Sequence, residues 1–241
     1  MFALIPARGG SKGIPRKNIV DVGGYPLIAY SIAASQLSAN ISRVFVSTED
    51  EEIAEISRQY GAEVPFMRPA ELSQDHSTDV GFLEHFFSLY DAEEVALIRP
   101  TTPFRDPAFM DEAINIYNNA KTSITGFRTV NEINENPYKV VQLENNIFKG
   151  FFSDFDGITN YTNLPRQTFP KAYTGNGHID VVKKNTVLTG TAFGDIIYGH
   201  VCEKMIDIDS QHDLDIARLL TQAQNSTIKK LQNQIERNIK S

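Results

Sequence analysis

The sequence predicts an α/β fold built on a mostly parallel sheet, and three observations carry this prediction. Short apolar, β-branched runs alternate with helical patterns over about the first 120 residues, which is the rhythm of βαβ units. Helix-capping residues stand between these runs, so the element boundaries are marked as well. The chain has 241 residues, 41% of them hydrophobic, and can therefore bury one large core.

Four strands are predicted in this first part, at Phe2–Pro6, Arg43–Ser47, Glu63–Met67 and Val95–Ile98. Pro26 stands at the first turn of the helix LIAYSIAASQL. Proline has no N–H, and an N–H at this position would have no partner within the helix. Thr48 and Glu51 have the spacing of a capping box before the second helix, EIAEISRQY.

Two further helices complete this part of the chain. Ser77 or Thr78 is expected to cap VGFLEHFFSLY, and Asp106 with Pro107 to begin the helix that follows. The apolar residues of that helix recur at the spacing that packs on a sheet.

The pattern breaks between Asn131 and Pro170 into short runs divided by Asn, Gly and Pro, which predicts hairpins inserted as an arm. It resumes with GHIDVVKK and DIIYGHVC, and Asp209 or Ser210 is expected to cap the next helix. The last stretch places four apolar residues on one helical face: Ile228, Leu231, Ile235 and Ile239. We expect a single domain, residues 1–241, with an arm at about residues 131–170 and a C-terminal helix at about residues 226–240.

Composition narrows the class of protein. No window approaches the roughly 18 to 20 apolar residues of a membrane span, and the N-terminus turns basic too soon for a secretion signal. The single cysteine, Cys202, cannot form an intramolecular disulfide, which fits a reducing compartment, and we expect it to be a small buried hydrophobe. A cytoplasmic protein is therefore expected. The formal charge of −7 argues against a general nucleic-acid binder, and the lack of an apolar span argues against a membrane partner.

Residues 3–19 read ALIPARGGSKGIPRKNI, an apolar run followed by a glycine-rich turn with four cations, Arg8, Lys12, Arg16 and Lys17. Glycines let backbone N–H groups approach an anion closely, so the turn is expected to bind a nucleoside triphosphate. Neither GxxxxGK[ST] nor GxGxxG is present, which disfavours ATPase and NAD-binding functions. The alternative is a basic surface turn whose glycines serve only the backbone.

Four segments follow predicted strands: Arg8–Asn18, Arg68–Asp79, Arg99–Arg105 and Asp207–Asp209. Ligands of open α/β sheets usually bind at the carboxyl ends of strands, so we expect these segments to converge on one site. Two prolines flank the threonines of IRPTTPFRDP, which would hold the backbone rigid beside a base or a sugar.

In IDID, two carboxylates alternate with two isoleucines, so on a strand Asp207 and Asp209 would face the same side. Hard oxygen ligands of this kind suit Mg²⁺ bridged to triphosphate oxygens. The alternative is that Asp209 only caps the next helix. The acidic residues 49–52 open a helix, where they complement its dipole, and we expect them to be solvated. The spacing of His178, His200 and Cys202 does not suit a metal site.

Five motifs, taken in order, resemble the CMP-sialic acid synthetase, or acylneuraminate cytidylyltransferase, family over about residues 3–220: ARGGSKGIPRKNI, RPAELSQD, RPTTPFR, PRQTFPKAYTGNG and IDID. The resemblance implies a Rossmann-like sheet with helices on both faces and a homodimer formed partly by the arm. It also implies Mg²⁺-dependent use of CTP as co-substrate. In such enzymes the anomeric hydroxyl of a 2-keto acidic sugar attacks the α-phosphorus of CTP, and pyrophosphate leaves.

The resemblance also implies roles for individual residues. The catalytic ones are Arg8 and Lys12, which would hold the triphosphate, and Asp209, which would help to deprotonate the acceptor. The residues expected to bind the nucleotide are Gly9, Gly10, Ser11, Lys17, Asn18, Arg68 and Thr78. The residues expected to bind the acceptor are Arg99, Thr101, Thr102, Arg105, Arg166, Asn176 and Asp180. The metal ligands would be Asp207 and Asp209.

Three departures from the family pattern lie around the expected acceptor site. Arg99 replaces a glutamine, Thr174-Gly175 replaces Arg-Pro, and Asp180 replaces a tyrosine. The acceptor is therefore open: N-acetylneuraminate, another nonulosonic acid, or a phosphorylated compound that would give a nucleoside diphosphate conjugate. Two other classes stay open as well, a catalytically silent nucleotide-binding protein and a nucleic-acid-binding module.

Overall fold

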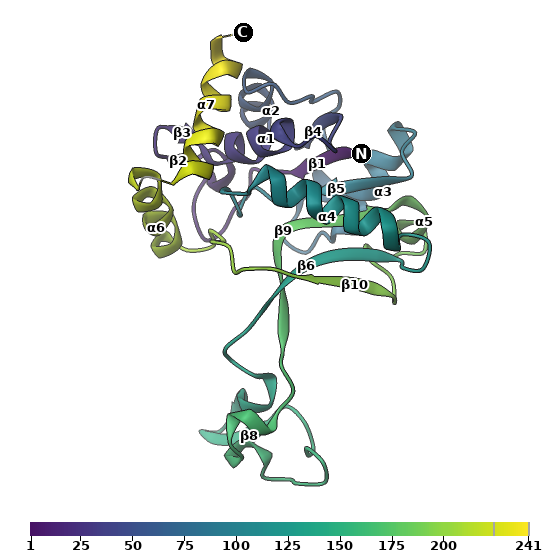
Figure 1. The fold of residues 1–241 in the computed structure, drawn as a ribbon, viewed down its shortest axis with the longest axis vertical. Helices are drawn as coiled ribbons and strands as arrows, with labels where there is room; N and C mark the ends of the chain where they lie inside the picture. Colours follow the sequence, from purple (N-terminus) through teal and green to yellow (C-terminus); the bar gives the residue numbers. More distant parts are fainter. Residues whose placement is uncertain (224, 241) are drawn as a thin grey trace.

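The computed structural model describes residues 1–223 and 225–240. Its centre is a six-stranded sheet in the order β10-β6-β9-β5-β1-β4 (Figure 1). The strands are β1 (Phe2–Pro6), β4 (Arg43–Ser47), β5 (Glu94–Leu97), β6 (Gly126–Glu132), β9 (Tyr173–Lys183) and β10 (Ile197–Val201). β1 pairs in parallel with β4 and β5, β10 pairs in parallel with β6, and only β9 runs antiparallel to its two neighbours. The predicted mostly parallel α/β fold is confirmed.

Helices cover both faces of this sheet. The helices are α1 (Leu27–Leu37), α2 (Glu51–Gln59), α3 (Asp79–Leu89), α4 (Pro107–Ala120), α5 (Lys184–Val187), α6 (Gln211–Gln222) and α7 (Ser226–Lys240). Successive side chains of β1 point to opposite faces of the sheet and belong to two different hydrophobic cores. Ala3 and Ile5 pack with α1, α2, α4 and α7, whereas Leu4 packs with α3 and α5. None of these helices is long and apolar enough to cross a membrane, as far as the described residues go.

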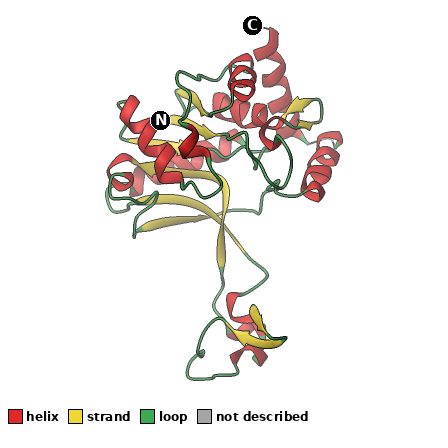
Figure 2. Ribbon diagram, turned by 180° about the vertical axis from the view of Figure 1, so that it is seen from behind, coloured by secondary structure: helices red, strands yellow, loops and turns green. Residues whose placement is uncertain are grey.

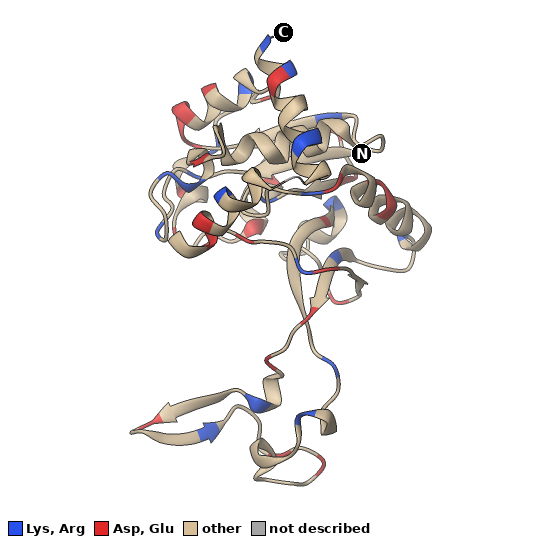
Figure 3. Ribbon diagram, turned by 60° about the vertical axis from the view of Figure 1, so that its left-hand side comes forward, with Lys and Arg blue, Asp and Glu red and all other residues tan. Residues whose placement is uncertain are grey.

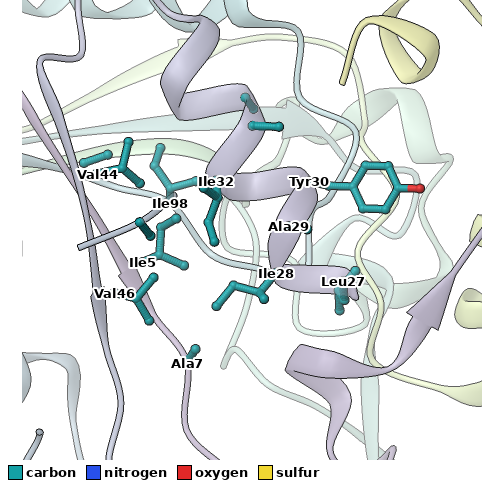
Figure 4. Packing of buried hydrophobic residues seen from close by; sticks show 14 of the residues in the cluster. Ile5, Ala7, Leu27, Ile28, Ala29, Tyr30, Ile32, Val44, Val46 and Ile98 are labelled. Carbon is teal, nitrogen blue, oxygen red and sulfur yellow. The ribbon is translucent and has the colours of Figure 1, made fainter. Parts of the chain in front are cut away.

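Helix α1 lies inside the molecule rather than on its surface. Every residue from Leu27 to Ser35 is buried, because the sheet lies against one side and α7 against another (Figures 1 and 4). Figure 4 shows Ile28 and Ile32 of α1 beside Ile5 and Val46 of the sheet. The apolar stripe of α7 is buried at Ile228, Leu231 and Ile235, whereas Ile239 is 46% exposed in the single chain.

The inserted segment leaves the sheet as an arm. β6 and β9 continue as two long strands, and the residues between them form a separate lobe (Figures 1 and 2). That lobe holds the predicted hairpin, β7 (Val141–Glu144) with β8 (Ile147–Gly150), joined by Asn145 and Asn146 at positive φ. Aromatic side chains pack around Tyr138 and Tyr161 in its interior.

Short elements complete the chain. The small hairpin β2 (Asp21–Val22) and β3 (Tyr25–Pro26) precedes α1. Single 3-10 turns are η1 (Lys17–Ile19), η2 (Ala70–Ser73), η3 (Pro137–Lys139), η4 (Tyr161–Asn163) and η5 (Arg166–Thr168).

One predicted strand is wrong. In place of a strand at Glu63–Met67, only Glu63 forms an isolated bridge, to Phe45. Pro65 has no N–H to donate, so the ladder cannot continue beyond Val64.

Capping also differs in part from the predictions. Asp50, not Thr48, caps α2 and accepts from the Ile53 N–H at 3.0 Å. Thr78 is the first flanking residue of α3, but within the described residues its side chain makes no capping bond. The cap at Asp106 is confirmed, and of the two alternatives for α6 the structure has Ser210, in a capping box with Asp213.

Candidate active site

A cavity of about 560 Å³ opens at the carboxyl edge of the sheet. All four segments that the sequence predicts to converge contribute to its lining, so that convergence is confirmed. The charged and polar lining residues include Arg8, Ser11, Lys12, Lys17, Asn18, Arg68, Thr78, Asp79, Arg99, Thr101, Asp207 and Asp209. Figure 3 shows acidic and basic residues interspersed over the body of the molecule.

The glycine-rich turn follows β1 and carries two cations that share one carboxylate. Arg8 Nη2 lies 3.4 Å from Asp75 Oδ1, and Lys12 Nζ lies 2.8 Å from Asp75 Oδ2. Lys12 is the main cause of a lowered pKa at the Asp75 carboxyl. Both cations are exposed enough to exchange this partner for a phosphate.

The base of the turn is fixed to the start of α2. Arg16 has a left-handed backbone, with φ of 55°, and its guanidinium pairs with both Asp50 and Glu52. The Gly9 N–H donates to Glu49 Oε1 at 2.7 Å. An added Cβ at Gly9 would lie 2.6 Å from Asp50 Oδ2, so only glycine permits this approach.

The prediction that residues 49–52 are simply solvated is therefore wrong for Glu49 and Asp50, whereas Glu51 and Glu52 are exposed as expected. Asp50 combines helix capping with the Arg16 ion pair, and the hydrogen bond from Arg16 is the largest cause of its lowered pKa. Acidic residues at the start of a helix are commonly explained by the helix dipole, but here Asp50 also contacts Arg16, more than thirty residues away in the sequence.

Asp207 and Asp209 lie on an irregular segment between β10 and α6, so the predicted strand is wrong there. The Ile208 N–H donates to the Thr101 carbonyl at 2.8 Å, which ties the segment to the loop after β5. Ile208 is buried while both aspartates line the cavity, so the expected alternation of side chains is retained without the strand.

These two carboxylates fit a magnesium ion that is shared with a nucleotide. Asp209 Oδ1 accepts from Lys17 Nζ at 2.8 Å, and its side chain is 73% exposed. Among the described residues, no three His, Cys, Asp or Glu side chains gather to hold a metal by themselves. Mg²⁺ is commonly held by one or two carboxylates together with substrate phosphates, so a pair of aspartates is a sufficient protein contribution.

Arg68 and Thr78 border the part of the cavity near α3. Arg68 is buried, donates from Nε to Ser47 Oγ at 3.0 Å, and has its Cζ 4.9 Å from the Phe82 ring centroid. Burial lowers the pKa of Arg68 to about 10.

The predicted acceptor residues divide into two groups. Arg99 and Thr101 line the cavity, and Arg99 pairs with Asp79 at the start of α3. Thr102 and Arg105 are fully buried behind it. Arg105 donates to the carbonyls of His178 at 2.5 Å and Gly177 at 2.7 Å, so it fixes the loop after β5 against β9.

Asn176 and Asp180 belong to β9, which lies on one side of β5, whereas β1 and its basic turn lie on the other side. Asn176 donates to Cys202 Sγ at 3.0 Å, and Cys202 itself is half-buried. Asp180 is buried beside Arg128, and burial raises the pKa of its carboxyl.

Arg166 lies on the arm and lines a second hollow, with Asn134, Phe169 and Lys171. Within one chain it is therefore brought to the neck of the arm rather than to the cavity.

Sequence reasoning counted Arg16 among the cations of the turn without its partners Asp50 and Glu52, and it missed Asp75, Asp79 and Arg128 as contributors to this region. Asp75 stands in the quoted RPAELSQD motif, so a cation partner could have been expected from its position opposite the basic turn. The others carry no local signal, because their partners are distant in sequence.

Comparison with known proteins gives a consistent result. The sequence profile described as Cytidylyltransferase matches residues 2–153. An N-acylneuraminate cytidylyltransferase of Escherichia coli O18:K1:H7 is 31% identical over 231 residues, which cover 93% of this chain and 53% of that protein. A CMP-N,N'-diacetyllegionaminic acid synthase of Legionella pneumophila is 38% identical over 122 residues, 48% of this chain and 53% of that protein. The chain thus spans about half the length of these curated relatives.

Solved structures share the fold. A CMP:2-keto-3-deoxy-manno-octonic acid synthetase complexed with CTP has a TM-score of 0.69 at 15% identity, covering 92% of this chain and 98% of that one. A cytidylyltransferase from Leptospira borgpetersenii has a TM-score of 0.62 at 13% identity, covering 98% and 94%.

Proposed function

The chain belongs to the cytidylyltransferase family, and we propose that it transfers CMP from CTP to a sialic-acid-like 2-keto acidic sugar with release of pyrophosphate. The observation that carries this proposal is the cavity whose lining combines the basic turn after β1 with Asp207 and Asp209. The resemblance to acylneuraminate cytidylyltransferases, stated from the motifs, is borne out by the relatives, and it supports the choice of acceptor class. A cytoplasmic location is part of the same proposal.

Each part of the cavity has a distinct task in the proposed reaction. Transfer of a phosphoryl group needs in-line positioning and charge neutralisation more than a protein nucleophile. Arg8 and Lys12 would exchange Asp75 for triphosphate oxygens, and the backbone N–H of Gly10 would donate to the same oxygens. Lys17 would stay beside Asp209 and neutralise charge on the phosphate nearest the metal pair.

Asp207 and Asp209 would hold Mg²⁺, which supplies Lewis-acid polarisation of the phosphoryl oxygens when bound. Asp209, whose side chain is 73% exposed, would accept the proton of the anomeric hydroxyl. Arg68 and Thr78 would contact the cytosine. Arg105 would act indirectly, through the loop that presents Arg99 and Thr101 to the acceptor.

Two variants test these roles against a matched control. Lys12→Ala removes one charge-assisted contact, worth about 1.5–3 kcal/mol, so kcat/KM for CTP is expected to fall about 10- to 100-fold. Asp209→Ala is expected to abolish Mg²⁺-dependent turnover. Lys230→Ala removes an exposed lysine of α7 and controls for the loss of one positive charge. Full activity in both site variants would contradict the assigned roles.

The acceptor class needs a separate screen. Four nucleoside triphosphates are each combined with 2-keto acids and with sugar phosphates, and pyrophosphate release is measured with and without Mg²⁺. Release that depends on CTP and a 2-keto acid supports the proposal, whereas release with a sugar phosphate supports the in-class alternative. Tight CTP binding without turnover on any acceptor would support a silent nucleotide-binding protein.

A homodimer formed partly by the arm is a second part of the proposal. The lobe exposes apolar side chains that its own small core leaves uncovered: Leu143 (63%), Ile147 (69%), Phe148 (77%) and Phe151 (58%). In a dimer, Arg166 would approach the acceptor in the partner's cavity. Light scattering at working concentration tests this, and Phe148→Asp is expected to shift a dimer to monomer. A monomeric wild-type mass would contradict the dimer.

A further inference from the structure

A row of charges crosses the sheet from the cavity toward its far edge. Arg99 follows β5, Asp180 lies on β9, and Arg128 lies on β6 directly opposite Asp180 in the strand register. Arg99 lines the cavity, and the charges of both arginines act on the Asp180 carboxyl. The row therefore extends the site away from the basic turn after β1. Its charges alternate, with Asp180 between Arg99 and Arg128.

Three contacts hold the Arg128 side chain in one orientation. Its Nη2 lies 3.3 Å from Asp180 Oδ2, and its Cζ lies 4.6 Å from the Phe193 ring centroid. The third contact is with the backbone of Gly175, where an added Cβ would lie 2.8 Å from Nη2 and 3.0 Å from Cζ. A guanidinium fixed in this way loses little conformational entropy when it binds a ligand.

The row also has hydrogen-bonding capacity that the described residues leave unused. Arg128 Nε and Asp180 Oδ1 are both buried and have no hydrogen-bond partner in the described part of the chain. Asp180 is 1% exposed, but the Arg128 side chain is 33% exposed, so donors of its fork reach solvent. An oxyanion placed on this exposed part of the fork would therefore meet guanidinium donors that reach solvent.

Neighbouring strands lie about 4.8 Å apart, so Arg128 on β6 is roughly 10 Å across the sheet from β5 and roughly 14 Å from β1. That places Arg128 beyond the triphosphate-binding turn, on the acceptor side. Gly175 belongs to the Thr174-Gly175 pair, one of the three departures from the family pattern. A larger residue at position 175 would collide with the guanidinium, so the observed position of the Arg128 side chain depends on the glycine.

We propose that Arg128 binds the carboxylate of the acceptor, and that Asp180 and Gly175 are positioning residues for its guanidinium. This inference rests on the proposed function, because it assigns one contact within the same transfer reaction. The planar fork of an arginine matches a carboxylate in two parallel hydrogen bonds, whereas a lysine offers a point charge.

The experiment uses the full chain with CTP, Mg²⁺ and whichever of N-acetylneuraminic, pseudaminic or N,N'-diacetyllegionaminic acid the wild type turns over. Arg128→Ala is expected to raise KM for that acid about 10- to 100-fold while KM for CTP stays within twofold. Arg128→Lys should recover only part of the loss. Gly175→Ala should resemble Arg128→Ala although the arginine is still present.

The matched control is Gly199→Ala. Gly199 stands opposite Arg128 on β10, but an added Cβ there would meet Val130 only at 3.7 Å, an ordinary contact. This variant should keep both KM values. Melting temperature and CTP binding, measured on every variant, separate loss of folding from loss of acceptor binding.

The methyl ester of the same acid tests the carboxylate itself. If Arg128 binds it, the ester and Arg128→Ala each raise KM, and the two changes together raise it no more than either does alone. Fully additive effects, or an unchanged acceptor KM in a folded Arg128→Ala protein, would overturn the inference while the proposed function stands. If the wild type turns over no 2-keto acid but accepts a sugar phosphate, the proposed function fails and the carboxylate assignment fails with it.

Discussion

Alanine at Gly13 tests whether the basic turn and the Asp209 segment must lie in contact for transfer. An added Cβ at Gly13 would overlap the backbone carbonyl oxygen of Asp209. The backbone of Gly13 lies outside the left-handed region, so alanine can adopt its φ and the substitution isolates the steric contact. Because the obstacle is backbone, side-chain rotation cannot relieve it.

The expected loss follows from the displacement. Relieving the overlap requires the turn and the aspartate segment to separate by roughly 1 Å, and a misplacement of that size costs about 10²-fold in rate. Overpacking of this kind also destabilises by about 1–3 kcal/mol if the segments cannot separate. Activity loss with an unchanged melting temperature would therefore indicate separation, and a lowered melting temperature would indicate strain.

The assay is pyrophosphate release at saturating acceptor, with kcat/KM for CTP as the measured quantity. Gly199→Ala is the comparison, because a Cβ there would meet its nearest neighbour, Val130, only at an ordinary contact distance of 3.7 Å. It adds the same methyl group away from the basic turn, so the difference between the two variants reports the contact. If Gly13→Ala is no more impaired than Gly199→Ala, the reasoning from contact to catalysis is wrong.

Three further predictions concern charges around the site. Asp50→Ala removes both a helix cap and the partner of Arg16, so we expect a loss of about 1–3 kcal/mol in urea unfolding at pH 7. Because the pKa of Asp50 is lowered, the ion-pair part of its contribution is present at neutral pH and disappears as pH falls through that pKa, and equal losses at pH 7 and in acid would contradict this. Asp75→Asn frees Lys12 from a competing carboxylate, so CTP binding measured by calorimetry should tighten several-fold, and weaker binding would instead give Asp75 a positioning role. Burial lowers the pKa of His178 to about 3, so the free energy of unfolding should fall as pH falls from about 6.5 toward about 3, by about 1.4 kcal/mol per pH unit. His178→Leu should remove this contribution to the pH dependence, and an unchanged dependence would refute the assignment.

Local patterns were sufficient to predict the elements whose neighbours the chain supplies nearby. β1 and β4 have the predicted bounds because their apolar runs are bounded by charged or turn residues. Asp106 with Pro107 starts α4 as expected, because capping is a contact within one turn. The site itself could be placed by one rule of topology, that parallel strands present their carboxyl ends at one edge.

Contacts between distant segments could not be predicted in this way. Residues 49–52 read as a solvated helix start, yet Asp50 fixes Arg16 more than thirty positions away. Arg105 stands in a motif that suggests ligand contact, but its full burial depends on β9, which follows some seventy residues later. Arg128 gave no signal at all, since its significance depends on the register between β6 and β9.

The measurement that tests the central claim most directly is the mass of the product formed from CTP, Mg²⁺ and a 2-keto acidic sugar. The proposed reaction predicts one CMP-sugar and one pyrophosphate per turnover, with no release when the acceptor, CTP or Mg²⁺ is omitted. A CDP-sugar formed from a sugar phosphate, or CTP consumed equally well without any acceptor, would contradict it.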